Sequence, residues 1–100
     1  MLKQTDGPVD GYVTVEIRAD IEPGVTIARH THPGIETGYV VEGGVDLAID
    51  GIGALTVKPG DGFQVPVGTP HSGKNGLGLE KTVAVATYVF EKGKPLASPA

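Results

Sequence analysis

The sequence contains no cysteine and no tryptophan, and its only aromatic side chains belong to 3 tyrosines and 2 phenylalanines. Without cysteine, the chain can form no disulfide and offers neither a thiolate nucleophile nor a cysteine-based metal site. The scarcity of aromatic residues means that a core must be built from Val, Ile, Leu and Ala. The 100 residues are 39% hydrophobic, which is sufficient for one domain, whereas the length is too short for two.

Basic residues are also few, since 8 Lys and Arg stand against 12 Asp and Glu and give a formal net charge of −4. The two arginines, Arg18 and Arg29, and the lysines do not cluster in the sequence. A nucleic-acid surface needs grouped basic side chains that contact phosphates. We therefore expect no nucleic-acid partner.

Long hydrophobic runs are missing as well, and none approaches the length needed to cross a membrane. We therefore expect no membrane partner. Residues 1–10 lack the basic and then apolar order of a signal peptide. We expect a cytoplasmic protein, and secretion stays open if a signal peptide has been removed.

Helical periodicity is absent too, and apolar residues instead alternate with polar ones in runs at residues 13–18, 45–50 and 82–90. In the first run, the apolar phase consists of Val13, Val15 and Ile17. Alternation of this kind is typical of strands with one buried face. Short strands in a chain with 16 Gly and 8 Pro indicate an all-β fold, either a sandwich or a closed barrel.

Glycine and proline residues mark the turns between these runs. The dipeptides Gly43-Gly44 and Asp50-Gly51 each predict a β-hairpin. Pro66 and Pro70 predict an edge strand or a bent strand followed by a loop. Residues 92–100 predict a peripheral tail that is either flexible or laid against a neighbour.

The three histidines of the chain are His30, His32 and His71. Side chains two residues apart in a strand point to the same side, so the imidazoles of His30 and His32 share one face. Glu36 follows four residues after His32, and a turn at residues 33–35 can bring its carboxylate back to the pair. This mixed set of imidazole and carboxylate ligands, with His71 added, suits Fe(II), Mn(II), Ni(II), Cu(II) or Zn(II).

Each of these residues also has an ordinary interpretation. A single His-x-His sequence is most often a surface pair on a strand. His71 after Pro70 is typical of a loop, and Glu36 alone is typical of a solvated carboxylate. The residues that surround them therefore decide between a metal site and these alternatives.

The histidines lie within two longer patterns. Residues 24–43 read GVTIARHTHPGIETGYVVEG, and residues 60–75 read GDGFQVPVGTPHSGKN. The first resembles the cupin superfamily motif G-x5-H-x-H-x3-E-x6-G, and the second resembles the cupin motif G-x5-P-x-G-x2-H-x3-N. Every fixed position is matched and the order is that of the family. Glycine matches carry little weight in a chain with 16 Gly, but every histidine of the chain falls on a motif histidine.

The resemblance to small single-domain cupins implies a double-stranded β-helix, or jelly-roll barrel, over residues 1–100. It implies that one divalent transition metal ion (Fe, Mn, Ni, Cu or Zn) is bound by His30, His32, Glu36 and His71. The motif glycines are interpreted as turn or strand-end positions that need a positive φ or a close backbone approach, namely Gly24, Gly43, Gly60 and Gly68.

Cupins perform unrelated functions on one fold, so the resemblance leaves the function open. We expect a metal-dependent dioxygenase or other oxidoreductase that acts on a small oxygen-rich substrate, because a site of three His and one Glu resembles that of quercetinase-type cupins. An isomerase, lyase or decarboxylase that uses the ion as a Lewis acid is the first alternative. A non-catalytic small-molecule binding protein is the second. In an enzyme, Glu36 is the candidate catalytic base, since a carboxylate is both basic and labile as a ligand.

Few residues beyond these ligands are candidates for the pocket. Val40, either Phe63 or Gln64, and Tyr88 could each reach it, although for each of them a place in the core is the more frequent situation. Asn75 is interpreted as a turn residue in preference to a pocket residue.

A homodimer is also expected. The strand predicted over Tyr12 to Arg18 exposes an edge that pairing with a second copy would cover. Small cupins are commonly dimers, so the resemblance implies the same state.

Overall fold

The computed structural model describes residues 1–76, 78 and 80–100. This part of the chain contains ten strands and no helix, which confirms the all-β expectation, and therefore has no helix long and apolar enough to cross a membrane. The strands are β1 (Lys3–Asp6), β2 (Tyr12–Ile21), β3 (Thr26–Thr31), β4 (Ile35–Glu42), β5 (Val45–Ile49), β6 (Gly53–Val57), β7 (Gly62–Val65), β8 (His71–Lys74), β9 (Thr82–Glu91) and β10 (Ser98–Pro99).

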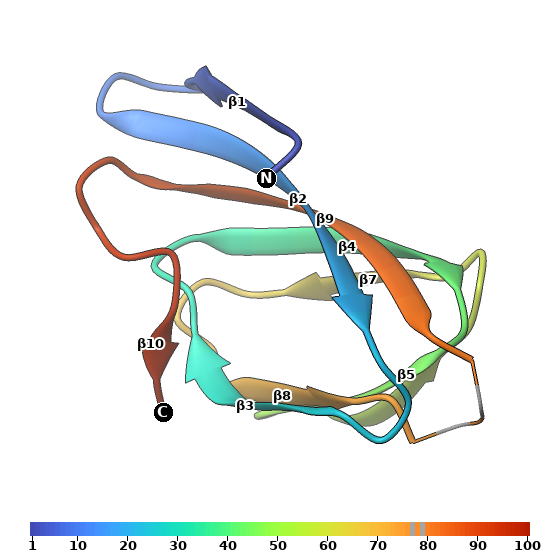
Figure 1. Ribbon diagram of the computed structural model, residues 1–100. Coiled ribbons are helices and arrows are strands. Elements are labelled where there is room, and N and C mark those ends of the chain that lie inside the picture. The colour runs from blue at the N-terminus through green and yellow to red at the C-terminus, as the bar shows by residue number, and fades with distance from the viewer. Residues whose placement is uncertain (77, 79) are drawn as a thin grey trace.

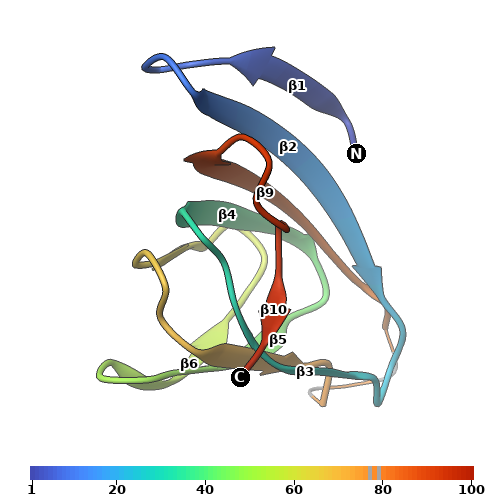
Figure 2. The same cartoon turned by 90° about the vertical axis from the view of Figure 1, so that its left-hand side faces the viewer.

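The strands form two sheets that face each other as two layers (Figures 1 and 2). The first sheet has the order β1-β2-β9-β4-β7, and the second has the order β10-β3-β8-β5-β6, with antiparallel neighbours throughout. Most connections carry the chain from one sheet to the other, as between β2 and β3 or between β8 and β9. This topology is that of the predicted jelly-roll barrel.

The three alternating runs are strands, as their pattern predicts, but one of the two predicted hairpins is wrong. Asp50-Gly51 lies in a hairpin, because β5 pairs with β6 in the register Ile49↔Gly53. Gly43-Gly44 instead connects β4 in the first sheet to β5 in the second. The apolar sides of β4 and β5 both have to face the interior, and the chain achieves this by changing sheets at the two glycines.

The motif glycines behave as expected, since all four have positive φ values between 67° and 91°. Gly43 also satisfies the expectation of a close backbone approach. A Cβ at this position would lie 2.7 Å from the carbonyl oxygen of Lys81 and 2.9 Å from the Cα of Thr82. The Thr82 hydroxyl is buried there and donates a hydrogen bond to the carbonyl of Gly44.

The edges of the sheets differ in part from expectation. β2, which contains the predicted edge strand Tyr12 to Arg18, pairs with β9 on one side and with β1 on the other. The edge at this side of the sheet is therefore β1, because the first residues form a strand that the alternation pattern does not reveal. The expectation for Pro66 and Pro70 is confirmed, since β7 is an edge strand and the loop that contains both prolines follows it.

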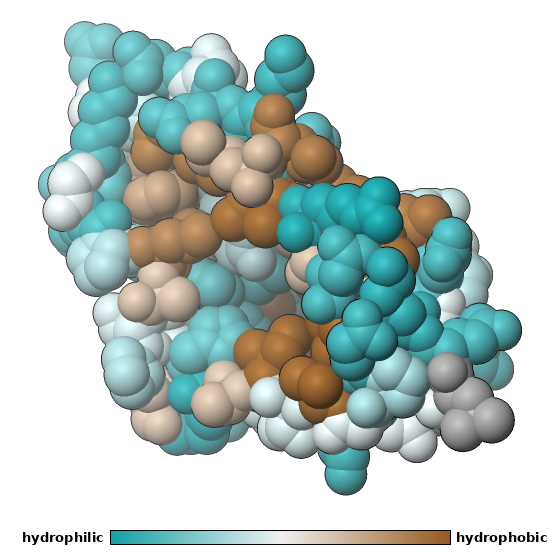
Figure 3. Space-filling view, viewed as in Figure 1, coloured by the Kyte–Doolittle hydropathy of each residue, from teal (hydrophilic) through white to brown (hydrophobic). Residues whose placement is uncertain are grey.

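The core lies between the sheets, on their inner faces. One cluster of buried residues joins β4 and β7 to β5 and β6, and it consists of Val40, Val45, Leu47, Ile49, Val57 and Val65. A second cluster lies at the end of the barrel where β2 begins and β9 ends, and it consists of Val13, Val15 and Phe90. Figure 3 shows hydrophobic surface bordering the hollow between the two layers.

Candidate metal centre

The two sheets bring the four predicted ligands together. His30 belongs to β3 and His71 begins the neighbouring strand β8, where the two residues are direct cross-strand partners. His32 directly follows β3, and Glu36 projects from β4 in the opposite sheet. His32, Glu36 and His71 are only 4–6% exposed, whereas His30 is half-buried. The site therefore lies between the layers and is closed to solvent on most sides.

A backbone carbonyl orients each imidazole through the Nδ1 atom. His30 Nδ1 lies 2.6 Å from the carbonyl oxygen of Ala28, and His71 Nδ1 lies 2.9 Å from that of Thr69. His32 Nδ1 lies 2.7 Å from the carbonyl oxygen of Leu96, in the C-terminal segment. Carbonyl oxygens only accept hydrogen bonds, so each Nδ1 carries the proton. In the neutral imidazole the Nε2 atom then has a free lone pair.

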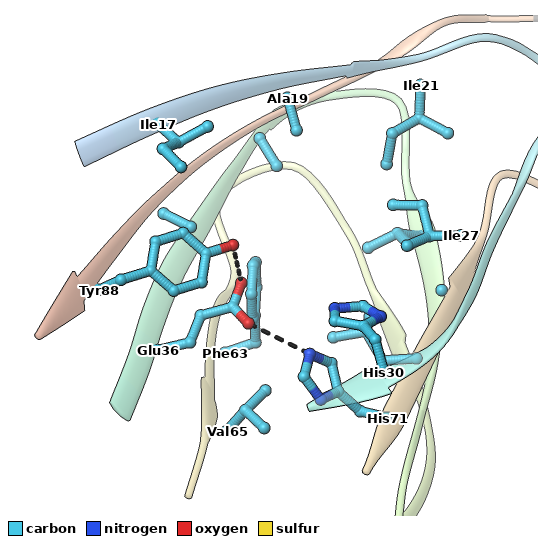
Figure 4. Close-up of a pocket in the computed structure, with 15 residues that line it drawn as sticks. Ile17, Ala19, Ile21, Ile27, His30, Glu36, Phe63, Val65, His71 and Tyr88 are labelled. Carbon is cyan, nitrogen blue, oxygen red and sulfur yellow. Dashed lines mark hydrogen bonds and ion pairs between the residues drawn. The ribbon is translucent and has the colours of Figure 1, made fainter. Parts of the chain in front are cut away.

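The Nε2 atoms of His32 and His71 both lie beside one carboxylate oxygen of Glu36, and Figure 4 shows the contact between Glu36 and His71. Glu36 Oε1 lies 3.2 Å from His32 Nε2 and 3.3 Å from His71 Nε2. The Nε2 atoms of His30 and His32 are 3.2 Å apart. Ligand atoms that bind one ion at about 2.1 Å and subtend a right angle lie about 3 Å apart, so this spacing fits a shared transition metal ion.

The hydrogen bonding of Glu36 is a second test of this fit. Among the residues that the structure describes, the buried Glu36 Oε1 has no hydrogen-bond donor as long as the imidazoles are neutral and protonated on Nδ1. A buried carboxylate oxygen without a partner is costly, and lone pairs that face one another repel. A cation would give the carboxylate oxygen a partner and would remove the repulsion between the lone pairs. His30, His32 and His71 form a group that could hold such an ion.

Tyr88 contacts the site in a way that the sequence pattern did not reveal. Its hydroxyl donates a hydrogen bond of 2.9 Å to Glu36 Oε2, so that Oε1 is left facing the imidazoles. Tyr88 also packs against the cluster that contains Val13, Val15 and Phe90, so it has a core role as well. The contact arises because Glu36 and Tyr88 are cross-strand partners in β4 and β9, a pairing that no local signal predicts.

The other pocket candidates have different positions. Phe63 lines the internal cavity beside the site, whereas Val40 is fully buried in the core. Gln64 points outward and donates to Thr37 Oγ1. Asn75 is 1% exposed, and its amide donates to the carbonyls of Ile21 and Glu80 at 2.8 Å and 2.9 Å. Asn75 thus has a structural role, in line with the preference for a turn residue over a pocket residue.

The electrostatics of the site favour a positive charge at its centre. Burial opposes the charge of Glu36, but the Tyr88 hydroxyl and the neighbouring His32 and His71, which become hydrogen-bond donors when protonated on Nε2, outweigh burial and lower the pKa of the carboxyl group to about 2. Burial lowers the pKa of His71, but Glu36 and the carbonyl of Thr69 together outweigh this effect and the pKa is raised overall. In the metal-free protein, a protonated His71 can therefore donate a hydrogen bond from Nε2 to the carboxylate. Burial and the negative charge of Glu36 raise the pKa of Tyr88, which therefore remains a hydrogen-bond donor at neutral pH.

Comparison with known families agrees with this geometry. Residues 17–90 match the family described as Cupin domain. The chain belongs to the cupin family. No curated protein matches it in sequence.

Solved cupin structures share the fold of this cupin. The DMSP lyase DddQ from Ruegeria pomeroyi is 17% identical with a TM-score of 0.72, and the alignment covers 92% of this chain and 44% of that one. An oxalate oxidase in complex with the substrate analogue glycolate is 26% identical with a TM-score of 0.73, and the alignment covers 88% of this chain and 45% of that one. An uncharacterised double-stranded β-helix protein from Klebsiella pneumoniae is 27% identical with a TM-score of 0.67, and the alignment covers 92% of this chain and 72% of that one. The cupin described here thus spans less than half the length of either enzyme.

Proposed function

We propose that this cupin binds one divalent transition metal ion through His30, His32, Glu36 and His71 and is an oxidoreductase of the dioxygenase type. The substrate is a small oxygen-rich molecule. The metal site is supported most strongly by the grouping of three oriented Nε2 atoms, two of which lie 3.2–3.3 Å from the buried Glu36 Oε1. The likeness to an oxalate oxidase at 26% identity favours oxidation over other cupin chemistries.

The protein groups each have a definite task in this proposal. The carbonyls of Ala28, Thr69 and Leu96 hold the imidazoles in the tautomer that leaves Nε2 free. The Tyr88 hydroxyl orients Glu36. When bound, the ion supplies Lewis acidity and open positions for substrate oxygens or O₂. The base role of Glu36 stays a prediction, and its pKa of about 2 favours the ligand role because so weak a base holds a proton poorly.

A Lewis-acid isomerase, lyase or decarboxylase is the second candidate, because of Tyr88. Its hydroxyl lies beside the site and lines the cavity, and its raised pKa keeps it protonated, so it can donate a hydrogen bond to a substrate oxygen. The dioxygenase proposal needs no such group.

Elemental analysis followed by turnover assays tests the proposal. Purified protein should contain about one transition metal ion per chain, and His71→Ala should lose it. Thr37→Ser, an exposed position next to Glu36 on β4, is the matched control and should retain the ion. Metal-dependent oxygen consumption would support the oxidoreductase, whereas turnover under nitrogen would support the Lewis-acid class. Wild-type protein that binds none of the five candidate metals would refute both.

The homodimer also stays a proposal, but its structural basis changes. The exposed edge strand is β1, and pairing with a second copy there would cover it. The outer side of β4 adds the exposed apolar residues Ile35, Tyr39 and Val41. Sedimentation at the monomer mass of 10.3 kDa at micromolar concentration would contradict the dimer.

A further inference from the structure

We propose that the cavity beside the metal centre selects compact, singly charged chelating ligands with a short alkyl body, such as short 2-oxo acids, and rejects dianions such as oxalate. This inference rests on the proposed function, because the ion must bind the ligand oxygens. It goes beyond the family likeness, since it separates this cupin from the oxalate enzymes that share its fold.

The lining of the cavity is the first argument. The cavity has a volume of about 130 Å³ and lies between the two sheets, directly against the candidate metal centre (Figure 4). Its polar lining residues are His30, Glu36, His71 and Tyr88, which belong to the site or contact it. Every other lining residue is Gly, Ala, Val, Ile, Leu or Phe. Apart from the metal centre, the walls can therefore contact only the apolar part of a ligand.

The charge balance is the second argument. With Glu36 as the one anionic ligand, a divalent ion leaves the site with a net charge of about +1. No Lys or Arg lines the cavity among the described residues. Arg29 is on the same strand as His30, but its guanidinium pairs with Asp50 at the surface. A singly charged ligand is therefore neutralised by the centre, whereas a dianion would leave one uncompensated negative charge buried in the cavity at a high cost.

The size of the cavity is the third argument. Its volume of about 130 Å³ is well below the roughly 300–1,000 Å³ of pockets that hold drug-sized ligands, so the ligand must be compact. The space exists because Ala19, Ala84 and Ala86 occupy the inner faces of β2 and β9, where Ala19 and Ala84 are cross-strand partners. Gly38 contributes as well, because a Cβ there would lie 2.2 Å from Cζ of Phe63 and displace this ring from its position against β4. Larger side chains at these positions would fill the cavity.

Binding of two acids to the metal-loaded protein tests the inference. In calorimetric titrations, 2-oxobutyrate should bind at least about tenfold more tightly than oxalate. The metal-free protein is the blank, and elemental analysis after each titration shows whether the ion has been retained. Oxalate that binds as tightly as 2-oxobutyrate, or no binding of either acid, overturns the inference. Wild-type protein that retains no metal overturns the proposed function itself, and the inference with it.

Two substitutions separate the size argument from the charge argument. Ala86→Leu should abolish binding of 2-oxobutyrate while elemental analysis still finds the ion, and Ala86→Val is the smaller change if Leu prevents folding. Ile17→Lys adds a positive charge to the lining and should raise the affinity for oxalate relative to 2-oxobutyrate by about tenfold. Unchanged affinities in Ala86→Val and Ile17→Lys would show that the ligands bind elsewhere, and would refute the inference.

Discussion

The C-terminal segment of this cupin contacts the candidate metal centre, and we predict that removing it weakens metal binding. The carbonyl of Leu96 accepts a hydrogen bond from His32 Nδ1 at 2.7 Å. The segment descends from β9 in the first sheet to β10 beside β3 in the second, as Figures 1 and 2 show. The Leu96 side chain packs against the cluster that contains Val13, Val15 and Phe90, and this packing positions the carbonyl.

The expected magnitude follows from what this hydrogen bond does. It orients the His32 ring and keeps the proton on Nδ1, so without it Nε2 can carry the proton instead or point elsewhere. Loss of one such outer-shell partner typically lowers metal affinity by about 10- to 100-fold, or about 1.4 to 2.8 kcal/mol. A variant that ends at Lys94 should therefore lose metal affinity within this range.

The matched control is a variant that ends at Ala97. It lacks the pairing of Ser98 and Pro99 with β3 but retains Leu96 and its carbonyl. Because the lost hydrogen bonds join main-chain groups and none of them holds an imidazole, its metal affinity should stay within about threefold of the wild type. Affinities are measured by competition with a chelator of known strength, and thermal melting of the metal-free forms checks that both variants fold.

The same contact makes a reciprocal prediction, because linkage acts in both directions. Bound metal should slow the removal of C-terminal residues by carboxypeptidase. Wild-type affinity in the variant that ends at Lys94, together with metal-independent digestion, would refute the proposed coupling between the segment and the site.

Three further predictions concern single side chains. Tyr88→Phe removes the donor to Glu36 Oε2 and should lower metal affinity by about tenfold or more in the same competition assay, whereas unchanged affinity would exclude an orienting role. In the metal-free protein, the pKa of Glu36 is lowered from 4.5 to about 2, so its contribution to stability is present above pH 4.5 and is lost as the pH falls towards 2. Urea unfolding should show a loss on the order of 3 kcal/mol over this range, and Glu36→Gln should show a smaller one. Asn75→Ala leaves the carbonyls of Ile21 and Glu80 without this donor and should destabilise the fold by about 1 to 3 kcal/mol in urea, with metal affinity unchanged; a parallel loss of metal would contradict its purely structural role.

The strands and the candidate ligands could be predicted because their signals are local. A period of two over residues 13–18 reports a strand with one buried face, whatever its partners are. Positive φ at Gly24 or Gly60 is a property of a single residue and its turn. The spacing of His30, His32 and Glu36 places three of the four candidate ligands within one stretch of chain, so only His71 has to come from a distant strand.

Only the tertiary structure decided the contacts that join segments far apart in the chain. The change of sheet at Gly43-Gly44 could not be distinguished from a hairpin, since both need a tight turn and only burial of both β4 and β5 selects the crossing. The hydrogen bonds of Tyr88 to Glu36 and of His32 to Leu96 join residues 52 and 64 positions apart. Their residue types suit many environments, and the register of β4 with β9 and the docking of the C-terminal segment bring them together. The sequence thus determined which side chains could hold a metal ion, whereas the packing of the two sheets decided which groups orient those side chains and what shape of ligand can reach them.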